Sequence, residues 1–293
     1  MSRRLSYLFG LLPLFLFSLL LSGGCAGNGT DVFSGATLSG DYAHSSLLSE
    51  TPSAAFSPIP SSKDILSPAS GFTPAPDASE APSDDPENAF RKAARENLSY
   101  YCDIALKSEF GDSDGKIHKW EDKIRLYVHP SADAEKYSGF IMEHIEVLNA
   151  IPGFPGIEIT GTEEEASAEL SFVDSGEMRK RSGDAAGSPP CGLVFLSWYG
   201  SDCRIFSGEI FILNEAESAP EDVRHSIVEE LTQLTGLLND SYARPDSIFF
   251  QGQSRQDSLA DIDILLVRMH YIVEFSCGMS YDEVCDAAER IFG

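Results

Sequence analysis

The chain changes character near residue 85, and this change decides which part of it can fold. Residues 26–85 are rich in Ser, Pro, Gly, Ala and Asp, and their apolar residues are isolated or in short pairs. Such a segment cannot bury enough apolar surface to offset the entropy that it would lose on ordering. We therefore predict a disordered tether over residues 25–85 and a single folded domain over residues 86–293.

The first 24 residues have the pattern of an export signal. Two arginines precede an apolar run that ends in Ser22-Gly23-Gly24-Cys25. The run falls short of the ~20 residues that a membrane-spanning helix needs, and its flank of small residues is typical of a cleaved signal peptide. The segment resembles the lipobox of bacterial lipoproteins, which implies cleavage before Cys25 and acylation of its thiol, as with palmitate. Ordinary secretion, with cleavage after Ala26, is the alternative.

Charge excludes one class of partner. The chain has 21 Lys and Arg against 46 Asp and Glu, a formal net charge of -25. This excess repels phosphate backbones, so we expect no nucleic-acid partner. The expected partners are the lipid bilayer, through acylated Cys25, and an unidentified protein or peptide. The expected location is extracytoplasmic, at the membrane of the cell envelope.

Periodicity in residues 86–293 predicts an α+β domain, with strands before the last helices. The clearest helix has a capping-box spacing and an early proline at Ser218-Ala219-Pro220-Glu221 and ends near Gly236. Strands are predicted at 123–129, 157–159, 168–173, 193–198 and 204–213. Further helices are predicted near 86–101, 137–148, 258–271 and 281–292.

Five cysteines remain besides Cys25, and export permits disulfides among them. Cys191 and Cys203 begin consecutive predicted strands, so we predict that these two pair. A thiolate metal site is disfavoured because no two of the five have CxxC spacing. A cysteine nucleophile is also disfavoured because no histidine partner is indicated. The remaining cysteines are Cys102, Cys277 and Cys285.

The most informative stretch is residues 229–240, EELTQLTGLLND. Glu229 and Gln233 are four residues apart on one face of the predicted helix, and Gly236 permits a left-handed turn that folds Asn239 back toward that face. This spacing is that of HExxHxxGxxH, in which three imidazoles hold zinc and the glutamate activates water.

The domain resembles the metzincin metallopeptidases, most closely their matrixin-like branch. The resemblance rests on Gly208–Phe211 before the helix, Ala168–Phe172 as an earlier strand, and Ser247-Ile248-Phe249 in place of the Met-turn. The spacing of Leu259, Asp263, Ile264, Val267 and Tyr271 matches the helix that follows this turn. The chain also resembles the DUF2927-type family of bacterial lipoproteins, which carries EExxQxxGLxND. The resemblance implies a zincin-like fold, a mixed sheet packed on an active-site-type helix with further helices.

The departures from the metzincin pattern decide the expected chemistry. Glu229, Gln233 and Asn239 stand where the three imidazoles would be, and only Glu230, at the general-base position, is kept. Zinc favours nitrogen and sulfur ligands over amide oxygens. Without a bound metal, water beside Glu230 is a poor nucleophile. We therefore expect no metal or other cofactor, no zinc proteolysis, and a binding or interaction module in the former substrate cleft.

Several alternatives stay open. One is an active metallopeptidase that holds a metal through Glu229, Gln233, Asn239 or Asp240, with Glu230 as base; another is a solute-binding lipoprotein, which would have two lobes. The same residues also fit the solvated face of an amphipathic helix, with Asn239-Asp240 as a turn. His225 is four residues before Glu229, but a surface position is expected for it. The other histidines lack ligand spacing; they are His118, His129, His144 and His270.

Overall fold

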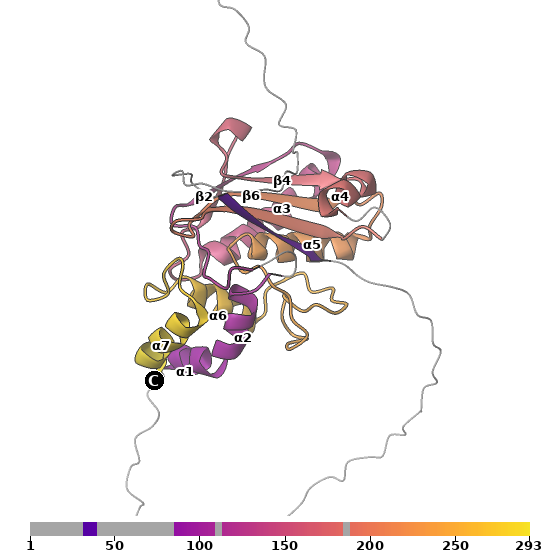
Figure 1. Ribbon diagram of the computed structural model, residues 1–293. Coiled ribbons are helices and arrows are strands. Elements are labelled where there is room, and N and C mark those ends of the chain that lie inside the picture. The colour runs from indigo at the N-terminus through magenta and orange to yellow at the C-terminus, as the bar shows by residue number, and fades with distance from the viewer. Residues whose placement is uncertain (1–31, 40–84, 109–112, 184–187) are drawn as a thin grey trace, which may run out of the picture. The chain divides into compact units, whose positions relative to one another are not determined.

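The computed structural model describes residues 32–39, 85–108, 113–183 and 188–293. The predicted signal peptide over 1–24, Cys25 and, apart from 32–39, the predicted tether lie outside these residues. The described part is a mixed α+β fold, as predicted, with one sheet and helices on its faces and below it (Figure 1).

One mixed sheet organises the fold, in the order β1-β5-β6-β4-β2-β3. The pairings β2–β3, β2–β4 and β4–β6 are parallel, and β5 runs antiparallel to β6. Without β1, the edge strand on this side of the sheet would be β5. The strands are β1 (Val32–Ser39), β2 (Ile124–Val128), β3 (Ile157–Ile159), β4 (Ala168–Val173), β5 (Gly192–Tyr199) and β6 (Ile205–Leu213).

Two helices cover the main face of the sheet. α3 (Ala132–Asn149) and α5 (Pro220–Gln233) pack together and place their apolar residues in the main core. Because successive side chains of a strand point to opposite faces, Ile210 and Ile212 of β6 join this core. Phe211 and Leu213 instead pack with Met178 of α4 (Ser175–Ser182) on the other face.

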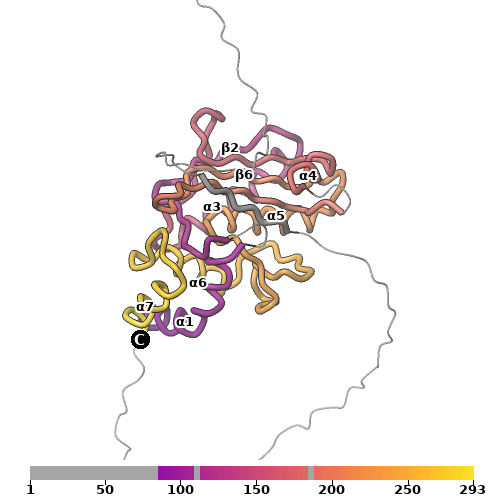
Figure 2. Tube along the Cα trace, viewed as in Figure 1, coloured from indigo at the N-terminus to yellow at the C-terminus, as the bar shows by residue number. Residues whose placement is uncertain are grey.

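The remaining helices bring the two ends of the domain together. α1 (Pro86–Glu96) and α2 (Leu98–Ala105) lie beside α6 (Asp261–His270) and α7 (Tyr281–Phe292) (Figure 2). The rings of Phe90 and Phe292 meet edge to face at 5.9 Å, and Tyr101 stacks on Phe275 at 5.3 Å. A short 3-10 turn, η1 (Glu163–Glu165), precedes β4.

Local sequence explains most helix boundaries. Ser131 caps α3 by accepting a hydrogen bond from the Ala134 amide at 3.0 Å, and Ser280 with Glu283 forms the capping box of α7. The predicted capping box of α5 is wrong, because its N-cap is Ala219 and no side chain caps it. Pro220 still suits the first turn, where its missing N–H has no partner to lose.

Three further features differ from the sequence prediction. The helix predicted near 86–101 divides at Asn97, whose side chain donates to the Ala93 carbonyl at 2.9 Å. α4 was not predicted because Met178 is its only buried residue. β1 lies within the predicted tether, where it pairs along the whole of β5. An unpaired strand edge offers N–H and C=O groups that an extended segment can satisfy.

The described residues all belong to one compact unit, Asp31–Gly293. Among the helices of the described residues, none has both the length and the apolar character of a membrane span.

Candidate functional site

Three polar residues in the second half of α5 are buried, although the sequence also fitted a solvated helix face. Glu229 is 2% exposed, and Glu230 and Gln233 are fully buried. The helix lies between α3 and the strands β5 and β6, so this face points into the fold. The interpretation of these residues as a solvated surface is therefore wrong.

We call four polar side chains the α5 polar row: His225, Glu229 and Gln233 of α5, and Asp240 beyond the turn that follows it. His225 Nε2 lies 3.5 Å from Glu229 Oε2, and His225 Nδ1 lies 2.8 Å from the Gln256 carbonyl oxygen. Gln233 Nε2 donates to Asp240 Oδ1 at 3.0 Å. Burial raises the pKa of Asp240 to about 7, although the bond from Gln233 opposes this shift. Burial therefore favours the protonated form of the Asp240 carboxyl group.

The turn at Gly236 forms as predicted, but it does not bring Asn239 to the row. Gly236 has φ +105°, and a Cβ there would lie 2.3 Å from the His118 carbonyl oxygen. Beyond the turn, Asn239 Nδ2 donates to the Asp103 carbonyl at 3.0 Å, and its amide donates to the Ile104 carbonyl. Asn239 is thus held against α2. The convergence of Glu229, Gln233 and Asn239 stays a prediction, and the side chain bonded to Gln233 is that of Asp240.

Glu230 reaches the beginning of β5. A Cβ added to Gly192 would lie 2.3 Å from Glu230 Oε1, so the absence of a side chain at residue 192 makes room for this carboxyl group. The requirement for glycine here was not visible in the sequence, because the two residues come from separate elements. Glu230 therefore lies where α5 meets the edge strand.

A second buried carboxyl group holds the turn at Ser247-Ile248-Phe249. Asp263 Oδ1 accepts from Ser247 Oγ at 2.6 Å and from the Ile248 amide at 3.1 Å, and Asp263 Oδ2 accepts from the Ala260 amide. Burial outweighs these bonds and raises the pKa of Asp263 to about 6. Asp263 thereby fixes this turn to the start of α6.

The α5 polar row is a poor zinc site. It offers two carboxyl groups, one amide and a single imidazole, and no thiolate. Zinc favours imidazole and thiolate, and an amide oxygen suits calcium better. Glu229, Gln233 and Asp240 remain the residues that would have to hold any metal at this place.

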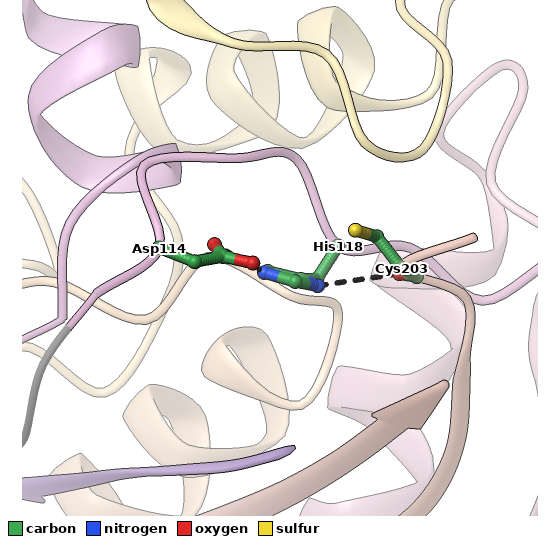
Figure 3. Close-up of side chains that lie close together, drawn as sticks. All are labelled: Asp114, His118 and Cys203. Carbon is green, nitrogen blue, oxygen red and sulfur yellow. Dashed lines mark hydrogen bonds and ion pairs between the residues drawn. The ribbon is translucent and has the colours of Figure 1, made fainter. Parts of the chain in front are cut away.

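A different set of side chains has the mixed donors that the row lacks. Asp114, His118 and Cys203 each place one donor atom within 4.8 Å of the donor atoms of the other two, the one such group among the described residues (Figure 3). We call them the Asp–His–Cys cluster. His118 and Cys203 are buried and Asp114 is exposed. The sequence prediction missed this cluster because Cys203 is far from the other two in the chain.

The predicted Cys191–Cys203 disulfide is not formed. The two cysteines lie at opposite ends of β5, because Gly192 begins that strand and Cys203 follows it. Eight residues of strand span about 26 Å, far beyond the reach of a disulfide. The prediction failed because β5 and β6 are antiparallel, and two antiparallel strands begin at opposite ends of the pair.

Comparison with known proteins identifies the family. No curated protein matches the chain. The model of a family described as "Protein of unknown function (DUF2927)" matches residues 94–290, which include α5, its turn and the Asp–His–Cys cluster. This match covers more than half of the chain, and the chain therefore belongs to the DUF2927 family, as its sequence predicted.

Proposed function

We propose that this protein is an extracytoplasmic lipoprotein whose metzincin-like domain is not a zinc peptidase and binds an extended peptide along β5. The lipid anchor would be acylated Cys25. The observation that carries the binding proposal is the pairing of β1 with β5, which runs from Val32–Tyr199 to Ser39–Gly192. The same sheet edge suits a peptide from a partner protein.

The arrangement of the elements supports the metzincin-like scaffold. Gly208–Phe211 lies in β6 and precedes α5, and Ala168–Phe172 lies in β4, which pairs in parallel with β6. The chain turns sharply at Gly236 after α5. The turn in the Met-turn position, Ser247-Ile248-Phe249, is tied to the next helix by Asp263.

The side chains of α5 support the loss of zinc chemistry. The first two ligand positions hold Glu229 and Gln233, and the third, Asn239, is hydrogen-bonded to α2. Gln233 donates a hydrogen bond to Asp240 Oδ1, a carboxylate oxygen that a metal at this place would need. Without a Lewis acid, Glu230 has no activated water to deprotonate.

Binding at β5 follows from general strand chemistry. An extended peptide gains affinity from main-chain hydrogen bonds to a sheet edge, and side-chain pockets give specificity. β5 pairs with such a segment along its full length, and its first residue touches Glu230. Glu230 thus lies beside one end of the proposed binding edge.

A competition experiment tests the binding proposal. Gly35 and Ala36 are both changed to Pro in the full chain. One of two neighbouring amides in a strand points to the partner strand, and proline has no N–H to donate, so the double change removes a β1–β5 hydrogen bond. A labelled synthetic peptide with residues 31–40 should then bind the variant saturably, and at least roughly tenfold tighter than it binds the unchanged chain. In the unchanged chain the attached segment competes with the peptide at high effective concentration.

In the matched control, Ala54 and Ala55, which lie outside β1, are changed to Pro. It should bind the peptide as weakly as the unchanged chain. Equal peptide binding by all three proteins, or by none, would contradict the proposal. Saturable binding of a small solute, without peptide binding, would favour a solute-binding lipoprotein instead.

A second experiment separates the binding module from an active metallopeptidase. Peptide cleavage and bound zinc are measured in the unchanged chain and after Glu230→Gln and Glu229→Gln. We expect no cleavage, and no change in zinc content in either variant. Zinc that is lost together with cleavage would favour the metallopeptidase.

The proposed address has its own test. Cys25→Ser should move the protein from the membrane fraction to the soluble extracytoplasmic fraction and abolish incorporation of labelled palmitate. Retention in the membrane by the variant would contradict the lipid anchor.

A further inference from the structure

The Asp–His–Cys cluster joins two connections that are distant in the chain. Asp114 and His118 belong to the segment between α2 and β2, and Cys203 belongs to the turn between β5 and β6. His118 Nε2 lies 2.9 Å from Asp114 Oδ1, and His118 Nδ1 lies 3.3 Å from the Cys203 carbonyl oxygen (Figure 3). The imidazole therefore lies between two oxygen atoms.

Both ring nitrogens of His118 face oxygen atoms. A neutral imidazole has one N–H donor and one lone pair, so it can donate to only one of these two oxygen atoms. A metal ion bound to the other nitrogen would use the remaining lone pair.

The contact between His118 Nδ1 and a backbone carbonyl oxygen is of the kind that orients metal-ligating histidines. Ligating histidines usually donate their other ring N–H to a carboxylate or backbone carbonyl, which orients the ring. His118 Nδ1 can donate to the Cys203 carbonyl in this way, and Nε2 then directs its lone pair toward the side of Asp114. The donor atoms are an oxygen, a nitrogen and a sulfur, a combination that zinc accepts.

The surrounding structure holds the cluster in place. The ring of Trp198 lies over that of His118 with centroids 4.0 Å apart, and His270 Nε2 lies 2.9 Å from the His118 carbonyl oxygen. Cys203 adopts φ +58°, unusual for a residue with a side chain, and its amide donates to the Tyr199 carbonyl at 2.8 Å. Strained backbone of this kind persists only where its surroundings fix it.

We propose that Asp114, His118 and Cys203 bind one zinc ion through a carboxylate oxygen, Nε2 and Sγ. Binding displaces the thiol proton of Cys203 into solvent and links the segment before β2 to the β5–β6 turn. The site is separate from the α5 polar row and does not depend on the proposed peptide binding. Because the Cys203 thiol must lose its proton to bind the ion, zinc binding should weaken as the pH falls.

The test measures zinc and cobalt binding by the full chain purified without chelators. We expect one zinc per chain, and a thiolate-to-metal charge-transfer absorption when Co²⁺ replaces it. Cys203→Ser should abolish that absorption, and His118→Ala should abolish stoichiometric zinc. Asp114→Asn changes an exposed residue and should leave the fold intact while weakening zinc binding at least roughly tenfold.

Matched controls are Cys191→Ser, a thiol at the other end of β5, and His129→Ala, a half-buried histidine beside Glu169. Both should keep full zinc content. The proposal would be overturned by a chain without zinc, by zinc that survives both His118→Ala and Asp114→Asn, or by peptide mapping that finds Cys203 in a disulfide with Cys277.

Discussion

The α5 polar row and the Asp–His–Cys cluster differ in how they are built and in what they can bind. The row lies on one helix and its following turn, and it has mainly oxygen donors that are buried and bonded to each other. The cluster combines two connecting segments and has oxygen, nitrogen and sulfur donors. The α5 polar row and the proposed zinc site thus occupy different places in the same domain.

Gly236 contacts both regions, so its substitution should have the largest effect. It ends the turn after α5, and a Cβ there would clash with the His118 carbonyl oxygen at 2.3 Å. Positive φ and overpacking together should lower the free energy of unfolding of Gly236→Ala by about 4 kcal/mol, measured by urea denaturation. Gly139→Ala, on the open face of α3, is the control and should be neutral or stabilising. Equal stability of the two variants would show that the turn does not couple the regions.

The row should show itself in the pH dependence of stability. The pKa of Asp240 is raised by burial to about 7, so the folded state keeps a proton that the unfolded state releases near pH 4. Stability from this group is therefore present at low pH and lost as the pH rises toward 7. Between pH 5 and pH 8 the free energy of unfolding should fall by roughly 2–3 kcal/mol more in the unchanged chain than in Asp240→Asn. Identical pH profiles would place Asp240 in a solvated environment.

Hydrogen bonds in the core connect Tyr101 through His270 to the backbone of His118 in the Asp–His–Cys cluster. Tyr101 Oη donates to His270 Nδ1, so that His270 Nε2–H can donate to the His118 carbonyl. Tyr101→Phe should cost about 1–2 kcal/mol in the free energy of unfolding because it leaves a buried nitrogen unsatisfied. Tyr242→Phe, at an exposed tyrosine, should change it by less than about 0.5 kcal/mol. A larger loss in Tyr242→Phe than in Tyr101→Phe would contradict this chain of contacts.

Asn239 should have the smallest effect. Its side chain donates to the Asp103 carbonyl rather than to the row, so Asn239→Ala should cost about 1 kcal/mol in the free energy of unfolding and leave zinc content unchanged. Metal analysis and urea denaturation of the same preparation check both parts. Loss of zinc in this variant would indicate that Asn239 is a metal ligand and would contradict the account.

Local patterns predicted most of the fold. The strands at 157–159 and 168–173 and the helix at 281–292 have the bounds that periodicity indicated, and Gly236 forms the predicted turn. Periodicity failed where the buried residues are few, as in α4, whose single buried residue is Met178. It also failed at β1, which is a strand by virtue of its pairing with β5.

The candidate sites were less predictable, because they depend on contacts between distant segments. Helical spacing correctly placed His225, Glu229 and Gln233 in one row. It could not show that Asn239 turns to α2 or that Gly192 makes room for Glu230. Asp114 and His118 are four residues apart in a connection that is not helical, so only the fold brings Cys203 to them.

Anomalous X-ray scattering at the zinc edge, from crystals of protein purified without chelators, tests the comparison most directly. The predicted result is one peak bounded by Asp114, His118 and Cys203, and none along α5. A peak among Glu229, Gln233 and Asp240 would contradict the account, because the helix would then still hold a metal.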